Sequence, residues 1–477
     1  MRRDFTTTAP PRAPGRLGSI GGAARDRAIR RGAAFALAAI AFVGALVLAP
    51  ARAEAIPAFA RRYETSCQTC HLVFPKLNPF GEAFRRNGYR FPSKGDATAE
   101  KEEPLPLGNE ALKDVWPNAV YPGQIPAKIP LSVAADLRAV LGTHLEPHNA
   151  GAPPGAVMEG MAMPADTGTL QSDFGQLGGN ARILAGGTFG EVASFFMAIS
   201  IGMHEPIEVE RAAVTFTPFD PTALQIKLGR FEPELHGISI HRNVFGHMLR
   251  LTTMGVLLDE AAPEHYVSGL QLAGVVAGRL GWSAGLGQNR APVPGLEKDV
   301  FGRLEYKFGG MRLDGVGTTA GSMAWREYSL TIGGSGYHGR GQVTYTMPGM
   351  DMSHVDRFNR VGLDAHAVIR DLLIDVVVAH QRNDQPGEKE FDPRNLDLAF
   401  AEVTYVAHPW FFPTVRFEGS RVTGPVKADT TSKWIGLLGV NAIVRANLVL
   451  RAELATGTDP GEKFGFRYAA LNGSFAF

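Results

Sequence analysis

The stretch from residue 448 to residue 454 reads Leu-Val-Leu-Arg-Ala-Glu-Leu. Its even-numbered positions are apolar, and two of the odd positions between them carry charged side chains. Because successive side chains of a β-strand point to opposite faces, this alternation predicts a strand with one oily and one charged face. The same period of two recurs at residues 303–308 and 342–347, so strands of this kind are expected throughout the second part of the chain.

Short and long connections alternate between such runs from Leu131 onward. This alternation is typical of barrels that span an outer membrane, which have short turns on one side and long loops on the other. A soluble β-sandwich, whose strands also have one wet face, is the alternative. Turns are expected near Glu191, 218–222, Gly281, Gly309, Ser335, 370–371, 408–409 and 445–447, and loops at 142–178, 204–208, 232–267, 289–298, 348–359, 382–396 and 423–431.

The chain ends in a further alternating run, residues 471–477, with Phe477 as the last residue. A terminal aromatic residue after such a run is typical of the signal for insertion into the outer membrane. Residues 131–477 are therefore predicted to form a mainly β fold, an antiparallel transmembrane β-barrel of about 16 to 18 strands. The direct count is 18, with 16 as the close alternative. An even number brings both ends of the barrel to one side, expected to be periplasmic.

An export signal is predicted over residues 1–53. Arg30-Arg31 is followed by 17 uncharged, mostly aliphatic residues, 33–49, and then by the triplet Ala51-Arg52-Ala53. The apolar run is short for a membrane-spanning helix, and the small-x-small triplet fits a signal-peptidase site before Glu54. An uncleaved membrane anchor is the alternative.

The charge balance argues against a nucleic-acid partner. The whole chain has a net charge of +1, but residues 1–53 hold nine arginines and two aspartates, which leaves −6 for the rest. Proteins that bind nucleic acid usually carry a basic excess.

Residues Cys67-Gln68-Thr69-Cys70-His71 form a C-x-x-C-H motif, the attachment pattern of c-type haem. Each thiol adds to one vinyl group, and His71 is placed to supply the proximal nitrogen to the iron. Half of a zinc site, a redox dithiol and a plain disulfide are the alternatives. A zinc site would need further ligands, and the chain has no other cysteine. We therefore expect one covalently attached haem c, with Cys67, Cys70 and His71 as cofactor-binding residues and His71 as the metal ligand.

Residues 54–92 are predicted to form a small α-helical mono-haem plug. Phe74, Leu77, Phe80 and Phe84 recur at helical spacing, with 78–79 as the start of a helix and 87–88 as its end. A unit of this size rarely folds without a covalent cross-link, a metal or a partner surface. The inside of the barrel is therefore expected to cover the side of the haem that the plug leaves open. The proline-rich residues 93–130 are predicted to be a linker or strap.

The plug sequence resembles the outer-membrane cytochrome-porin fusions of iron-oxidising bacteria. The resemblance covers about 35 residues; across the barrel it is architectural only. It implies a single haem c in an N-terminal plug, followed by a porin-like barrel, and a protein that takes electrons from ferrous iron outside the cell. The residues that carry it are Pro57, Phe59, Ala60, Arg61, Cys67, Cys70, His71, Phe74, Pro75, Leu77, Phe80, Gly81, Phe84, Gly88 and Tyr89.

A low-spin haem needs a second axial ligand, and residues 72–92 contain neither Met nor His. The segment 232–267 is favoured as its source because long loops are usually functional. Solvent-exposed or lid residues are the plainer reading of each candidate. The candidates are His236, His241, His247, Met248 and Met254; Met158, Met161 and Met163 with His144 and His148; and Met347, Met350 and Met352 with His354.

These observations lead to a functional hypothesis with two alternatives. The chain is expected to pass electrons from a small extracellular donor, ferrous iron above all, to a periplasmic carrier while it sits in outer-membrane lipid. Whether it counts as an enzyme, a ferrous-iron oxidase, stays open. A diffusion porin with a structural or gating haem plug is the first alternative. A periplasmic haem sensor or soluble cytochrome without a barrel is the second.

Overall fold

The protein was analysed as a computed structural model. The predicted export signal and Phe477 lie outside the described residues, as does most of the predicted strap. The structure describes residues 57–92, 99–101, 105–106, 114–115, 124–125, 130–142, 171–173, 180–189, 192–202, 207–220, 222–245, 263, 265–288, 297–317, 325–347, 350–386, 392–426, 430–458 and 465–476.

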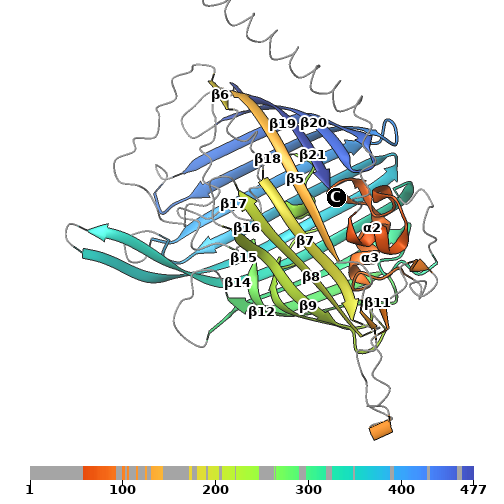
Figure 1. Ribbon diagram of the computed structural model, residues 1–477. Helices are drawn as coiled ribbons and strands as arrows, with labels where there is room; N and C mark the ends of the chain where they lie inside the picture. The colour runs from red at the N-terminus through yellow and green to blue at the C-terminus, as the bar shows by residue number, and fades with distance from the viewer. Residues whose placement is uncertain are drawn as a thin grey trace, which may run out of the picture. The chain divides into compact units, whose positions relative to one another are not determined.

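Sixteen long strands, counted over the described residues, close into an antiparallel β-barrel (Figure 1). The last strand pairs with the first, Ala476 opposite Ala134, so both ends of the barrel lie at the same rim. A short strand, β6 (Gln171–Asp173), extends the pairing of β5. The sixteen strands are β5 (Leu131–Gly142), β7 (Asn180–Phe189), β8 (Ala193–Gly202), β9 (Glu208–Phe216), β10 (Gln225–Phe231), β11 (Val267–Val276), β12 (Leu280–Gln288), β13 (Asp299–Gly309), β14 (Glu327–Met347), β15 (Met350–Arg370), β16 (Leu372–Asn383), β17 (Arg394–Tyr405), β18 (Phe411–Thr423), β19 (Thr431–Arg445), β20 (Leu448–Thr458) and β21 (Gly465–Ala476).

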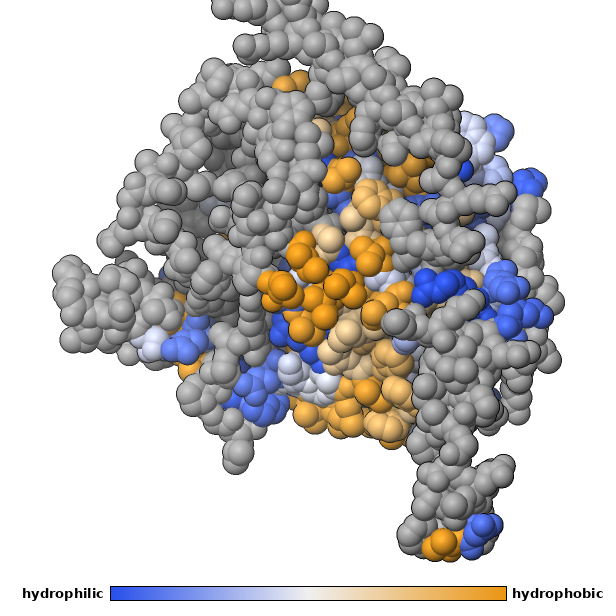
Figure 2. Space-filling model, in the orientation of Figure 1, coloured by the Kyte–Doolittle hydropathy of each residue, from blue (hydrophilic) through white to orange (hydrophobic). Residues whose placement is uncertain are grey.

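The predicted alternation gives the barrel wall its two faces. On β13 the side chain of Leu304 is 61% exposed on the outside, whereas its neighbours Arg303 and Glu305 are buried in the lumen. On β20 Leu454 faces outward and Arg451 inward in the same way. Figure 2 shows hydrophobic side chains gathered over the strands that face the viewer in Figure 1. An apolar exterior around a charged interior is the arrangement of a membrane-spanning barrel.

Aromatic side chains lie on the outer face at the rim with the short turns. Phe308, Tyr328, Tyr405 and Trp410 are all at least half exposed there. Such a girdle marks the boundary between lipid and water in outer-membrane barrels. Among the described residues, no helix is long and apolar enough to span a membrane.

Residues 57–92 form a compact segment, here called the plug. It consists of α2 (Ala58–Tyr63), the 3₁₀ turn η1 (Cys67–Thr69), the paired strands β1 (His71–Val73) and β2 (Lys76–Leu77), and α3 (Pro79–Arg86). Asn78 caps α3 by accepting a hydrogen bond from the backbone N–H of Gly81, and Gly88 takes up a left-handed conformation (φ 63°) just after its end. Both helix boundaries are as predicted. Phe74 and Leu77, however, precede the helix, because β1 and β2 form a hairpin there.

The plug lies at the barrel end where the C-terminus lies (Figure 1). The backbone N–H of Ala58 bonds Ser132 at the start of β5, and Arg90 bonds the carbonyl of Ala193 at the start of β8. In the predicted strap, β3 (Leu105–Pro106) pairs with β4 (Gln124–Ile125).

The predicted turn at Ser335 is wrong. β14 runs straight through this residue, which pairs with Arg303 on one side and Gly362 on the other. The predicted loop 348–359 is wrong as well, since β15 already begins at Met350. Residues 333–336 read Gly-Gly-Ser-Gly, a composition typical of turns, but β13 and β15 pair with all four of them. The false turn at Ser335 would divide β14 into two strands, and the barrel has sixteen strands, the close alternative to the direct count of 18.

One connection at the turn rim is longer than the predicted pattern allows. Residues 310–326 join β13 to β14, and their first part packs against the plug. The carbonyl of Asp314 accepts a hydrogen bond from the side chain of Asn87. A Cβ on Gly315 would overlap Pro92 and Ala83, so the two segments are in close contact. The described first part of the connection, residues 310–317, therefore lies against the plug.

Candidate functional site

The C-x-x-C-H residues form one tight turn braced by Asn78. Cys67–Thr69 make the 3₁₀ turn η1, and His71 begins β1. The side-chain amide of Asn78 donates to the carbonyl of Gln68 at 3.0 Å and to that of Thr69 at 3.1 Å, and its backbone N–H donates to Cys70 at 3.0 Å. Asn78 is 1% exposed. One buried side chain therefore caps α3 and fixes the turn at the same time.

Gly81 lets α3 approach the turn. A Cβ at this position would overlap the carbonyl oxygen of Cys70. The close approach is possible only without a side chain, which explains a glycine inside a helix where it costs about 1 kcal/mol relative to alanine.

The side chains of Cys67, Cys70 and His71 are all partly buried, and both thiols are free. Burial raises the pKa of Cys67, and it raises that of Cys70 to about 12. Reactive dithiols have lowered pKa values, so these thiols do not fit a redox-active pair.

The His71 ring is held through Nδ1, which lies 3.1 Å from the carbonyl oxygen of Pro75. Burial lowers the pKa of His71 to about 4, so the ring is neutral at pH 7. A neutral ring that donates through Nδ1 keeps the lone pair of Nε2 for a metal.

An aromatic cluster lies beside Cys70. Its buried members are Tyr63, Phe80, Phe84 and Phe91, and Cys70 packs against them. Free thiols on one turn, an imidazole anchored through Nδ1 and an adjoining apolar wall are the features that a c-type haem needs. The residues present therefore fit the group.

Met311, in the connection between β13 and β14, packs against the same cluster. The methionines and histidines considered from the sequence all come from long loops, whereas Met311 stands beside a predicted turn, and its position next to Cys70 adds it to the candidates for a second axial ligand.

The favoured loop candidates lie elsewhere. Residues 232–245, here called the luminal segment, fold into the barrel after β10 and include η3 (Ile240–Arg242). His236 packs against Gly362 on β15, and His241 stacks on Tyr266 with ring centroids 5.2 Å apart. Within the described part of the chain no contact joins either ring to His71.

Most of the other candidates for the second axial ligand lie outside the described residues. His354 bonds the backbone carbonyl of Gln385, and Met347, Met350 and Met352 belong to the β14–β15 hairpin. The remaining ones lie outside the described residues, namely His144, His148, Met158, Met161, Met163, His247, Met248 and Met254.

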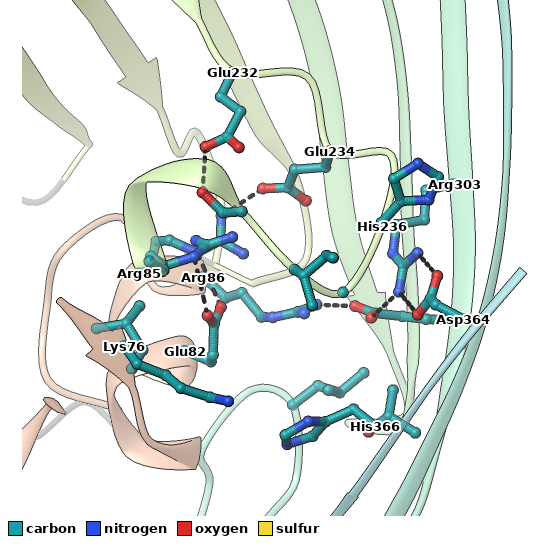
Figure 3. A pocket seen from close by; sticks show the side chains of 18 of the residues that line it. Lys76, Glu82, Arg85, Arg86, Glu232, Glu234, His236, Arg303, Asp364 and His366 are labelled. Carbon is teal, nitrogen blue, oxygen red and sulfur yellow. Dashed lines mark hydrogen bonds and ion pairs between the residues drawn. The ribbon is translucent and has the colours of Figure 1, made fainter. Parts of the chain in front are cut away.

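Buried ion pairs join the plug to the inside of the barrel (Figure 3). Lys76 Nζ lies 2.8 Å from Asp375 Oδ2 on β16 and 2.7 Å from Glu402 Oε1 on β17. Arg86 pairs with Glu305 on β13. Breaking a buried pair leaves an uncompensated charge and costs about 3–5 kcal/mol, so these contacts hold the plug in one position.

The plug also pairs with the luminal segment. Arg85 forms an ion pair with Glu234, and Arg242 lies 3.6 Å from Glu82. A cavity of about 190 Å³ remains between the two, lined by both and by the barrel wall. No cluster of three or more potential metal-ligating side chains occurs in the described part of the chain.

No protein-family model and no curated protein matches this chain. Among solved structures, it is similar to OmpF of Salmonella typhi in complex with daunomycin, at 12% identity and a TM-score of 0.49 over 73% of this chain and 98% of that one. It is also similar to a loop L8 deletion mutant of OmpT, an outer membrane protein of Vibrio cholerae (13% identity, TM-score 0.48, 73% and 99%), and to an anion-selective porin from Comamonas acidovorans (11%, 0.44, 73% and 99%). The barrel itself rests on its own strand pairing.

Proposed function

We propose that this chain is an outer-membrane electron-transfer protein in which Cys67, Cys70 and His71 hold one covalently attached c-type haem. The observation that carries the proposal is the setting of the C-x-x-C-H turn. It belongs to a plug whose buried cations pair with the inner wall of a closed barrel. We also propose that the chain belongs with the cytochrome-porin fusions that its plug resembles.

A bound haem iron would supply one-electron chemistry at this turn. The chain's own residues do the rest. The two thiols would hold the cofactor, and Nε2 of His71 would be available to bind its iron because Nδ1 is engaged by the carbonyl of Pro75. The aromatic cluster beside Cys70 excludes water from one side.

The proposed orientation puts the plug end of the barrel in the periplasm and the luminal segment toward the outside. A periplasmic carrier then reaches the plug from its own side, and a small donor such as ferrous iron approaches from the other. The apolar band of such a barrel is about 25 Å tall, so one carrier inside it shortens the distance that electrons must cross.

A diffusion porin with a structural or gating plug is the second candidate. The closed barrel and the cavity of about 190 Å³ in its lumen favour it. Against it stand the buried ion pairs, which hold the plug to the barrel wall and to the luminal segment inside the lumen. A porin of this kind would conduct small solutes whatever the redox state of its plug.

Anaerobic mixing of the purified full chain with ferrous iron separates the two functions. We expect the absorption bands of a reduced c-type haem to appear after ferrous iron is added. The double variant Cys67→Ala/Cys70→Ala should lose covalent haem and this response. A wild-type chain with extractable, noncovalent haem, or one that stays oxidised while it admits small sugars into vesicles, would support the porin instead.

A substitution at Met311 tests the second axial position. Met311→Ala should convert a low-spin spectrum to a high-spin one if this thioether is the ligand, and His236→Ala or His241→Ala should do so if the luminal segment supplies it. The spectrum is read on the oxidised chain without any donor, so its outcome does not depend on electron transfer.

A further inference from the structure

The cavity between the plug and the luminal segment is lined by eleven Lys or Arg side chains and seven Asp or Glu side chains, some of which Figure 3 shows, so cations are in excess. Two of the carboxylates, Glu82 of the plug and Glu234 of the luminal segment, pair with three of the cations. Glu82 pairs with Arg85 at 3.1 Å and with Arg242 at 3.6 Å. Glu234 pairs with Arg85 and, at 3.9 Å, with Lys227.

A fourth cation, Arg211 on β9, lines the same cavity. Its guanidinium lies 4.8 Å from the centre of the Phe196 ring, and its buried Nε has no hydrogen-bond partner. No carboxylate pairs with it in the described part of the chain. Stacking on an aromatic ring leaves the edge of a guanidinium free to bind an anion in bidentate fashion.

His236 is the second unusual group in the lining. It is 6% exposed, and neither ring nitrogen has a hydrogen-bond partner. Burial, together with the positive charges of Arg360 and Arg303, lowers its pKa to about 3, so the ring is neutral at pH 7. An unsatisfied buried polar group costs about 1–3 kcal/mol, which a ligand that bonds it would recover.

The cavity is small. At about 30 Å³ for each water molecule, 190 Å³ has room for about six. That volume suits a small organic acid.

We propose that this cavity binds a small anion with two or three carboxylate groups. Arg211 and Lys227 supply the positive charge, and His236 supplies a neutral hydrogen-bonding group. The site belongs to the barrel, the plug and the luminal segment together, and it does not require a haem.

Titration calorimetry with citrate on the purified full chain in detergent tests the site. We expect saturable binding of one citrate, weakened at least tenfold by Arg211→Gln and by His236→Phe, which keeps the ring without its nitrogens. Arg138→Gln is the matched control, because it removes an inward arginine on β5 that does not line the cavity. Triethyl citrate, the neutral ester, should not bind.

Three results would overturn the proposal: no citrate binding by the wild-type chain, equal weakening by Arg138→Gln, or equal binding of the neutral ester. Each variant is first checked for the heat-dependent gel shift of a folded barrel. If Arg211→Gln does not fold, Lys227→Gln carries the same expectation.

The anion site also predicts which form of iron donates electrons to the chain, an inference that rests on the proposed function. A hydrated ferrous cation would be repelled by the excess positive charge, whereas an anionic carboxylate complex of iron would be attracted. Ferrous citrate should therefore reduce the chain faster than ferrous sulfate, and Arg211→Gln should remove the difference. Citrate binding by Cys67→Ala/Cys70→Ala, which lacks the haem sites, keeps the two proposals distinguishable.

Discussion

The side chain of Asn78 has two structural roles: it caps α3 and it braces the C-x-x-C-H turn. As the cap of α3 it only needs to accept a hydrogen bond, which Asp or Ser would do equally well. As the brace of the C-x-x-C-H turn it must also donate two, to Gln68 and Thr69, and only an amide can do both. The residue type is thus explained by the turn and not by the helix.

We predict that Asn78→Ala and Asn78→Asp both lower the fraction of chains that carry covalent haem. The alanine variant loses the cap, worth about 1 kcal/mol, and leaves two carbonyls without donors. The aspartate variant keeps the cap but sets a carboxylate against the same carbonyls. Haem-stained denaturing gels measure the fraction. An aspartate variant with wild-type haem content would reduce Asn78 to a helix cap.

At the scale of elements, α3 and the luminal segment are joined by charge. Burial alone would raise the pKa of Glu82, but Arg242, Arg85 and Arg86 outweigh it and lower the pKa to about 2. A carboxylate with a lowered pKa contributes stability above its ordinary pKa of 4.5, and this contribution is lost as the pH falls toward 2.

We therefore predict that Glu82→Gln loosens α3 at pH 7 but has little effect near pH 2. The gap between the two chains should close as the pH falls from 4.5, because only the wild-type residue becomes protonated. Amide-exchange protection factors of α3, corrected for intrinsic rates, measure this. A gap of constant size across that range would mean that the charge of Glu82 does not matter.

At the scale of the whole molecule, the two faces of the wall divide the chemistry between lipid and lumen. Leu363 on β15 is 64% exposed within the apolar band, and Ser353 is exposed on the same face of the same strand toward the long-loop rim. An arginine in the band of a membrane barrel costs about 2–4 kcal/mol, and one near the interface about 0–1.

We predict that Leu363→Arg strongly lowers insertion into lipid vesicles, whereas Ser353→Arg leaves it close to the wild-type value. The inserted fraction is read from the heat-dependent gel shift. If both arginines are tolerated equally, residue 363 does not face lipid.

The sequence by itself was sufficient for most features that depend on neighbours in the chain, although it placed Phe74 and Leu77 on a helix where β1 and β2 form a hairpin. Alternation with period two predicted the strands and which of their faces is apolar, because each side chain's direction follows from its position. The cap at Asn78 and the stop at Gly88 were predicted for the same reason. The sequence also predicts the cofactor-binding residues Cys67, Cys70 and His71, whose chemistry is contained in five consecutive positions.

Only the tertiary structure decided what depends on distant partners. Ser335 resembled a turn until β13 and β15 were seen to pair with it on both sides. Lys76 finds Asp375 and Glu402 some three hundred residues away, and no local pattern marks such a pair. Arg211 and Met311 were likewise ordinary residues of a strand and a turn in the sequence. The roles proposed for them and for His236 depend on closure of the barrel around the plug, because closure sets which side chains share the lumen.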